Sequence, residues 1–542
     1  MKKIQYLFAT IVLGLSLSSC GDSFLTQYPE GGTLLQDQYD KLPDALQGSI
    51  MGIYSKLYEY SDHDEFGQRS IDMYGDIQSG DMAMKSNSYG WFRTYERGMF
   101  YAYARSYIWS FYYDIINLTN ICAVAVENDL QAIQDATTSG QKPSDAIILQ
   151  GYYYGQVLAL RGWAYSGLLR YYCNPMDQLE NPMDDEKAIP VYTAKEVQDG
   201  SLGERRATVT EVYDRVYEDL VDAITLLDFY GKYKERSSKL EVNADVARLI
   251  LAYAMLNHGD KDALLYENGT KNAYDLAYEY ATAVINKKKF PLLKKAELTT
   301  TGFCDVNAAN WMWGEDVTVE NTTALGSFFG QVDIHTYSYA AAGDTKGIDS
   351  KLYNEIKDLA WDGRLAWFRK PGKNGYCPDG KFYNPKTKNE TDLDKVDRDW
   401  LCDNVFMRVE LAYLIAAEAA WANGDNANAV KYIKLLCDER FDDAKQTEYN
   451  TWLGTLDGNA DAIKTALVYN WRVEMWGEGY GLQTLRRLNK KVTLGTNHQY
   501  RAGATIDMSV EDDRMSCQCE IPTSETRYNP NLNKTKFQES NN

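Results

Sequence analysis

The chain has 542 residues, 44% of them hydrophobic, so it is long enough to bury a large core. Its formal net charge of −20 repels phosphate backbones, which argues against nucleic acid as a partner. Tyrosine is unusually frequent, with 42 residues against 16 phenylalanines and 12 tryptophans. Because tyrosine and tryptophan combine an apolar face with a polar tip, they suit a half-hydrated recognition surface as well as helix packing.

The first residues carry an export signal. Lys2 and Lys3 precede a short apolar stretch at 7–17, which is too short to cross a bilayer. The following Leu-Ser-Ser-Cys at 17–20 matches the bacterial lipobox, in which the cysteine is acylated after cleavage. An ordinary secretory signal with a chance cysteine is the alternative. We therefore predict a signal peptide at 1–19, lipidation at Cys20 and a polar tether at 20–32.

Beyond the tether the dominant pattern is helical, with apolar residues recurring every three or four positions. The stripes cover 157–171, 212–227, 246–256, 276–283, 407–421 and 429–436. In two of them an alanine-rich helix runs into a glycine followed by aspartate, at Gly259-Asp260 and Gly424-Asp425. Such a glycine can end one helix and the aspartate can begin the next. The pattern predicts an all-α fold of tetratricopeptide-like helix pairs.

Three regions interrupt the helical pattern, at about 76–107, 294–345 and 371–400. They mix polar and turn-forming residues with aromatic ones and have weak periodicity. Long loops on a rigid scaffold commonly carry binding function. We expect these regions to be loop-rich, ligand-facing insertions in a single domain that spans 33–542.

Several segments resemble the SusD/RagB family of Bacteroidetes surface lipoproteins. Residues 155–165, GQVLALRGWAY, resemble the family's G-E-A-x-x-L-R-A-x-x-Y helix, with Gln156 in place of the usual acid. Residues 408–419, RVELAYLIAAEA, resemble R-x-A-E-x-Y-L-I-x-A-E-A, with Glu410 one place early. Further similar segments lie at 188–191, 208–220, 471–487 and 521–530. Their order along the chain makes the resemblance stronger than any one segment does.

The resemblance implies a lipid-anchored protein on the outer face of the outer membrane. Such a protein captures an oligosaccharide and delivers it to a SusC-like TonB-dependent transporter. A peptide-binding RagB-like lipoprotein is the first alternative, and a surface glycosidase is the second. A helical scaffold without any ligand is the third.

Catalytic motifs do not stand out in the sequence. The four histidines are isolated and form no zinc pattern, and Gly-Glu-Gly-Tyr-Gly at 477–481 lacks the preceding strand of a dinucleotide site. Two carboxylates held about 5 to 9 Å apart could hydrolyse a glycoside, but the many acids single out no pair. We predict a protein that is not an enzyme and needs no metal or cofactor.

Charged residues inside the family-like helices suggest a structural role instead. A buried charge must be paired, so we expect salt bridges rather than catalysis at these positions. They are Arg408, Glu418, Glu474, Glu478 and Arg486.

A glycan-binding surface needs aromatic rings flanked by hydrogen-bonding side chains. Two stretches have that mixture, and core packing is the alternative for each of their rings. The first, at 76–95, supplies Asp81, Asn87, Tyr89, Trp91, Arg93 and Tyr95 as ligand-binding candidates. The second, at 310–339, supplies Trp311, Trp313, Phe328, Gln331, Tyr337 and Tyr339.

The cysteines after Cys20 are scattered and form no disulfide framework. Cys122, Cys173 and Cys437 lie in helical patterns and are expected to be buried thiols. Cys517 and Cys519 leave a single C-terminal disulfide open.

Overall fold

The computed structural model describes residues 45–96, 102–173, 188–201, 203–234, 238–259, 266–386 and 398–533. The signal peptide, Cys20 and the tether lie outside these residues. Contacts divide the chain into the units Met1–Ser49 and Ile50–Asn542. The helices and strands of the described residues belong to the second unit, apart from α3 (Ala45–Lys56), which begins in the first.

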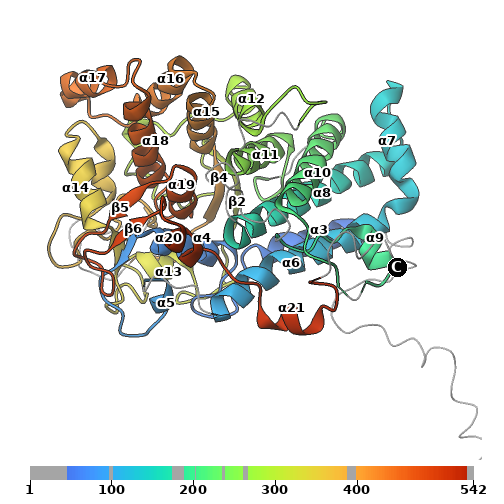
Figure 1. Cartoon of the computed structure of the whole chain (residues 1–542), viewed down its shortest axis with the longest axis horizontal. Helices are drawn as coiled ribbons and strands as arrows, with labels where there is room; N and C mark the ends of the chain where they lie inside the picture. The colour runs from blue at the N-terminus through green and yellow to red at the C-terminus, as the bar shows by residue number, and fades with distance from the viewer. Residues whose placement is uncertain are drawn as a thin grey trace, which may run out of the picture. The chain divides into compact units, whose positions relative to one another are not determined.

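A row of packed helices forms the scaffold of this unit (Figure 1). Each helix packs against the next, which confirms the predicted all-α fold of helix pairs. In order they are α8 (Asp145–Tyr172), α10 (Val209–Tyr230), α11 (Ala244–His258), α12 (Ala273–Asn286), α15 (Glu410–Ala422) and α16 (Asn426–Cys437).

Small residues let the first two scaffold helices approach closely. A Cβ atom added at Gly155 would lie 2.9 Å from Cγ of Leu227, and one added at Gly162 would lie 2.8 Å from Cγ of Leu220. Both leucines belong to α10. Glycine at these positions of α8 therefore sets the separation of the two helices.

The described helix ends follow the predicted chemistry in part. Asp260 lies outside the described residues, and the next described helix, α12, is capped by Asn272. Gly259 ends α11 in the left-handed conformation with a φ of 67°, and Gly424 has a φ of 80° just after α15. Asp425 caps α16 by accepting a hydrogen bond from the Asn428 N–H at 3.0 Å. Both glycines are used as expected, because only glycine adopts this conformation without strain.

The remaining helices surround this row. They are α4 (Gln68–Ser79), α5 (Arg93–Glu96), α6 (Ala102–Ala125), α7 (Leu130–Ser139), α9 (Ala194–Gln198), α13 (Phe328–Val332), α14 (Ser350–Asp358), α17 (Gln446–Gly454), α18 (Ala460–Glu474), α19 (Gly481–Arg487), α20 (Glu511–Ser516) and α21 (Thr523–Tyr528). Short 3₁₀ turns lie at Glu127–Asp129, Lys295–Glu297, Gly363–Trp367 and Asp443–Lys445. Among the described helices, none is both long and apolar enough to cross a membrane.

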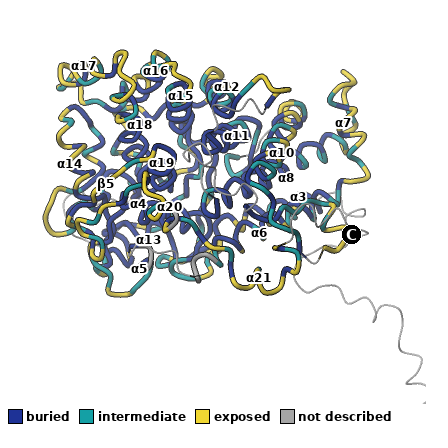
Figure 2. The backbone as a smooth tube through the Cα atoms, viewed as in Figure 1, coloured by how far each residue is buried: buried dark blue, intermediate teal, exposed yellow. Residues whose placement is uncertain are grey.

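The described residues form three short antiparallel strand pairs. Two of them join segments that are distant in sequence, and the third is local. Strand β1 (Met82–Met84) pairs with β3 (Lys346–Ile348), and β2 (Trp311–Glu315) pairs with β4 (Asn404–Arg408). Strand β5 (Lys491–Thr493) pairs with β6 (Thr505–Asp507). The first pair joins the predicted region 76–107 to the strand just after 294–345, and the second joins 294–345 to the strand before α15. Figure 2 shows the scaffold interior as buried and the outer turns, such as those of α17, as exposed.

Candidate functional site

Five aromatic side chains from three segments gather where the first two loop-rich regions meet. We call Tyr60, His63, Tyr89, Trp91 and Tyr339 the aromatic platform. The ring centroid of His63 lies 4.8 Å from that of Trp91 and 5.4 Å from that of Tyr339. The Tyr89 ring lies 5.0 Å from Tyr339, and Tyr60 lies 5.8 Å from His63. The Tyr89 side chain is 57% exposed, so the cluster opens to solvent.

A buried carboxylate holds the loop that presents Tyr89. Asp344 is 1% exposed and accepts hydrogen bonds from the backbone N–H groups of Ser88 and, at 3.0 Å, of Tyr89. The Asn87 side chain accepts one from the Gly90 N–H at 2.6 Å. Gly90 has a φ of 94°, a conformation that favours glycine. The turn is thus fixed before any ligand arrives.

A second set of polar contacts supports the platform from below. Gln331 is fully buried and donates from Nε2 to the backbone oxygen of His63 at 2.9 Å. Its Oε1 accepts from Nζ of Lys346 at 2.8 Å. Burial lowers the pKa of Lys346 to about 8. Gln331 therefore links strand β3 to the backbone of His63.

Hydrogen-bonding groups flank the rings. Nδ1 of His63 is buried and has no partner among the described residues. Asp62 accepts a hydrogen bond from the His63 N–H at 2.7 Å, and its side chain is partly exposed. Burial raises the pKa of Asp64, on the other side of His63. Rings with adjacent donors and acceptors can bind a ligand that has apolar faces and polar edges.

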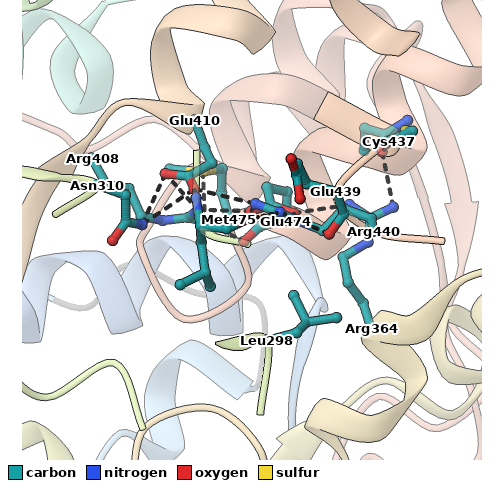
Figure 3. Close-up of polar contacts among 12 residues, drawn as sticks. Leu298, Asn310, Arg364, Arg408, Glu410, Cys437, Glu439, Arg440, Glu474 and Met475 are labelled. Carbon is teal, nitrogen blue, oxygen red and sulfur yellow. Dashed lines mark hydrogen bonds and ion pairs between the residues drawn. The ribbon is translucent and has the colours of Figure 1, made fainter. Parts of the chain in front are cut away.

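The densest polar cluster of the described residues lies in the core, not at the platform (Figure 3). Glu474 pairs with Arg408 at 2.7 Å, with Arg440 at 2.8 Å and with Arg364 at 3.1 Å, and all four side chains are fully buried. These guanidinium groups hold the pKa of the Glu474 carboxyl well below its usual range, against the effect of burial. We call these four residues the Glu474 network.

Further charges complete the network. Arg408 also contacts Glu410 and Glu478, at 3.2 and 2.9 Å, and Lys381 pairs with Glu478 at 2.7 Å. Since every partner is buried, the network ties α18 to β4, α15 and the loops rather than facing a ligand. The predicted salt-bridge role of Arg408, Glu474 and Glu478 is confirmed.

The other two predicted charges behave differently. Glu418 is paired, but with Arg487 at 2.8 Å. The guanidinium of Arg486 donates to the backbone oxygens of Arg170 and Cys173, both at 2.7 Å. Backbone oxygens at the end of α8 therefore hold the Arg486 guanidinium.

Two sequence models of one family match the chain. A model described as "Starch-binding associating with outer membrane" matches residues 44–251, and one described as "SusD family" matches residues 361–537. Together the matches span more than half of the chain. The chain belongs to the SusD/RagB family.

Solved structures of this family share the fold. A SusD-like carbohydrate binding protein from Bacteroides vulgatus is 20% identical, with a TM-score of 0.66 over 91% of this chain and 99% of that one. A SusD superfamily protein from Bacteroides thetaiotaomicron is 18% identical, with a TM-score of 0.66 over 90% and 98%. A putative sugar binding protein from Bacteroides vulgatus is 20% identical, with a TM-score of 0.62 over 91% and 98%. No curated protein matches the chain.

In this SusD-family chain, the first predicted stretch lies partly at the platform. Tyr89 and Trp91 belong to it, and Asn87 shapes its turn. Arg93 is exposed at the start of α5, and the side chain of Tyr95 lies outside what the structure describes. Asp81 is 1% exposed and pairs with Arg472 at 2.7 Å, so it leaves the candidate binding set.

The residues of the second predicted stretch, 310–339, fall into two groups, at the platform or exposed and in the core. Tyr339 joins the platform, and Tyr337 is 70% exposed two residues before it. Trp311 and Trp313, however, are 1% and 0% exposed because β2 pairs with β4 over the core. The Trp313 ring packs 5.5 Å from Trp163. Both tryptophans are core residues in this structure.

Two more residues of that stretch are also internal. Phe328 is fully buried beneath the guanidinium of Arg69, which lies 3.9 Å from the ring centroid. Gln331 supports the platform from below but does not reach its surface. Neither side chain can contact a ligand in this conformation.

Sequence reasoning missed Tyr60, His63 and Asp344. The first two lie in 58–66, YEYSDHDEF, which has the same mixture of aromatic and polar residues as the predicted stretches. An isolated histidine carried no metal pattern and so gave no reason to select it. Asp344 acts through backbone N–H groups 255 and 256 residues away, which no local pattern signals.

The cysteines of the described residues are free thiols. Cys122, Cys173 and Cys437 are buried as expected, and Cys517 and Cys519 are each 3% exposed. No group of three or more His, Cys, Asp or Glu side chains within the described ranges is arranged to hold a metal ion.

Proposed function

We propose that this chain is a glycan-binding lipoprotein, anchored through Cys20 to the outer face of the outer membrane. It captures an oligosaccharide and delivers it to a SusC-like TonB-dependent transporter. The lipobox and the family's description as associating with the outer membrane support the location. The similar structures that are called carbohydrate or sugar binding support the ligand class.

The observation that carries the proposal is the aromatic platform. Sugars present apolar C–H faces and hydroxyl edges, which match aromatic rings with flanking polar groups. Tyr89 supplies an exposed ring, and the partly exposed Asp62, next to His63, supplies a carboxylate. Because Asp344 and Gln331 already hold the backbone in place, little ordering entropy is lost on binding.

Isothermal titration of the purified chain with a panel of oligosaccharides tests the ligand class. We expect Tyr89→Ala to weaken the affinity for the glycan that binds by about 2- to 10-fold, as for the loss of one aromatic contact. Tyr528→Ala is the matched control, because this tyrosine is 75% exposed in α21, outside the platform. Equal affinity of both variants and the native chain would place the site elsewhere.

The same titration separates the alternatives. Heat with peptides and none with any glycan would favour a RagB-like peptide-binding protein. Turnover of an oligosaccharide by the purified chain would establish a glycosidase instead. We propose binding without catalysis. In the described core, the carboxylates of Glu410, Glu474 and Glu478 are each paired with arginine or lysine.

A further inference from the structure

A second aromatic pocket lies between α6, α9 and α21, and shares no residue with the platform. Its volume is about 390 Å³. Trp109 and Tyr113 come from α6, Tyr192 precedes α9, and Glu196 and Glu525 come from α9 and α21. In Figure 1, α9 and α21 lie on the opposite side of the unit from α14 and α17.

The three rings of this pocket are fixed in place. The centroids of Trp109 and Tyr113 are 4.5 Å apart, and those of Tyr113 and Tyr192 are 5.9 Å apart at an interplanar angle of 82°. The Tyr113 hydroxyl donates to the backbone oxygen of Pro190 at 2.7 Å. The Tyr192 hydroxyl accepts from the Glu204 N–H at 3.1 Å. Two walls therefore meet nearly at right angles, with both hydroxyl groups engaged by the backbone.

The two carboxylates are also held by neighbouring groups. Glu196 accepts a hydrogen bond from the Thr193 N–H at 2.7 Å in the capping box of α9. Glu525 accepts from Nδ2 of Asn529 at 2.7 Å, and Asn529 in turn donates to the Glu204 backbone oxygen at 2.8 Å. The second contact ties α21 to the loop after α9, which keeps Glu525 beside the rings.

The described residues of the lining include no positively charged side chain, since none of them is lysine, arginine or histidine. The closest approach of a cation to Glu196 is that of Lys195, whose Nζ lies 4.0 Å away but 3.0 Å from Asp199, and whose side chain is 75% exposed. Burial raises the pKa of Tyr192 to about 12, and the carboxylates of Glu525, Glu204 and Glu196 act in the same direction. The pocket thus combines aromatic walls with two carboxylates and, among its described lining residues, no cation.

We infer that this pocket binds an organic ammonium group, such as that of an amino sugar or a choline-like compound. The negative face of an aromatic ring attracts a cation within about 6 Å, and the attraction grows when water is excluded. The two carboxylates add a charge-assisted interaction that a neutral molecule of the same shape does not make. This site is separate from the platform and does not depend on the glycan-binding proposal.

Titration calorimetry at low ionic strength with matched ligand pairs tests the inference. The mature full-length chain is titrated with choline and with its neutral isostere 3,3-dimethyl-1-butanol, and then with glucosamine and with glucose. We expect at least one ammonium compound to bind about tenfold or more tightly than its neutral partner. Preference in the first pair alone indicates a quaternary amine, and preference in the second indicates an amino sugar. Equal affinities within both pairs would overturn the inference.

Charge-removing variants locate the site. Glu525→Gln and Glu196→Gln keep the side-chain shape, and glutamine can still serve in the capping box. Each should weaken ammonium binding several-fold, whereas Asp145→Asn, at a carboxylate 95% exposed at the start of α8, should not. Ammonium binding unchanged in both glutamine variants, with the thermal unfolding temperature of the native chain, would also overturn the inference.

Failure here and failure at the platform are distinguishable. Tyr89→Ala should leave ammonium binding intact, and Glu525→Gln should leave glycan binding intact. If Tyr89→Ala abolished the ammonium heat, the ligand would be at the platform, and the pocket would not be its site.

Discussion

The aromatic platform and the Glu474 network use the same kinds of side chain in opposite ways. In the Glu474 network and the charges around it, each carboxylate meets guanidinium or ammonium groups, and the pKa of Glu474 is held well below its usual range. At the platform, burial raises the pKa of Asp64, and Nδ1 of His63 has no partner among the described residues. Paired buried charges stabilise the fold, whereas the platform presents the exposed Tyr89 ring and the partly exposed Asp62 carboxylate to a ligand.

Removing the central charge of the network should have the largest effect on stability. Glu474→Gln leaves three buried arginines with one carboxylate fewer, and breaking a buried ion pair costs about 3–5 kcal/mol. Urea unfolding at neutral pH measures this loss. Because the folded pKa of Glu474 is depressed, its contribution is present above the unfolded pKa and is lost as pH falls toward the folded value. The native chain should therefore lose more stability than the variant between neutral and acid pH.

Truncating Trp313, a tryptophan of the predicted binding stretch, should lower stability as the loss of Glu474 does. Trp313→Ala removes a fully buried ring that packs against Trp163 and Phe406, and such truncations cost about 3–5 kcal/mol. Unfolding measurements should show this loss, while ligand affinity measured on the folded protein stays the same. A drop in affinity without a drop in stability would mean that Trp313 reaches the ligand after all.

A buried histidine links α5 to the start of α14 and gives a smaller, pH-dependent effect. Nδ1 of His498 lies 2.9 Å from Glu96, and Nε2 lies 3.1 Å from Asp349. Although burial acts to lower it, hydrogen bonds with these two carboxylates raise the pKa of His498 to about 8. A raised pKa stabilises the fold below the unfolded value, and that stability disappears as pH rises through about 8.

We therefore expect His498→Asn to remove about 2 kcal/mol of stability at pH 6 and much less at pH 9. Thermal unfolding across this range, with the native chain measured in parallel, gives the comparison. An equal loss at both pH values would indicate that the imidazole acts only by packing.

Substitutions at the platform should have the smallest effect on stability. Their main effect should be a lower affinity for the glycan. Trp91 is partly exposed, and its ring lies 4.8 Å from His63. Trp91→Ala should weaken glycan affinity by about 0.5–1.5 kcal/mol while reducing stability less than Trp313→Ala does. Titration calorimetry and urea unfolding of the two variants side by side test the contrast. Equal stability losses would contradict the division into platform and core.

Local patterns predicted the scaffold well, because helix periodicity and capping depend on neighbours in sequence. Gly259 and Gly424 take the left-handed conformation expected of them, and Asp425 caps the next helix. The partners of buried charges were less predictable. Arg408 and Glu474 do meet, and Arg486 also donates to backbone oxygens at the end of α8. Which atoms surround a buried charge depends on segments that are distant in sequence.

For the binding residues, the sequence by itself determined composition but not exposure. Trp91 and Trp313 stand in equally aromatic and polar surroundings along the chain, yet pairing of β2 with β4 buries only Trp313. The tertiary structure also brings Tyr60 and His63 into the platform, and it places Asp344 within hydrogen-bond distance of the Tyr89 N–H. Helical periodicity is a local property that a sequence carries, whereas the side of a loop that faces water is decided by what packs against its other side.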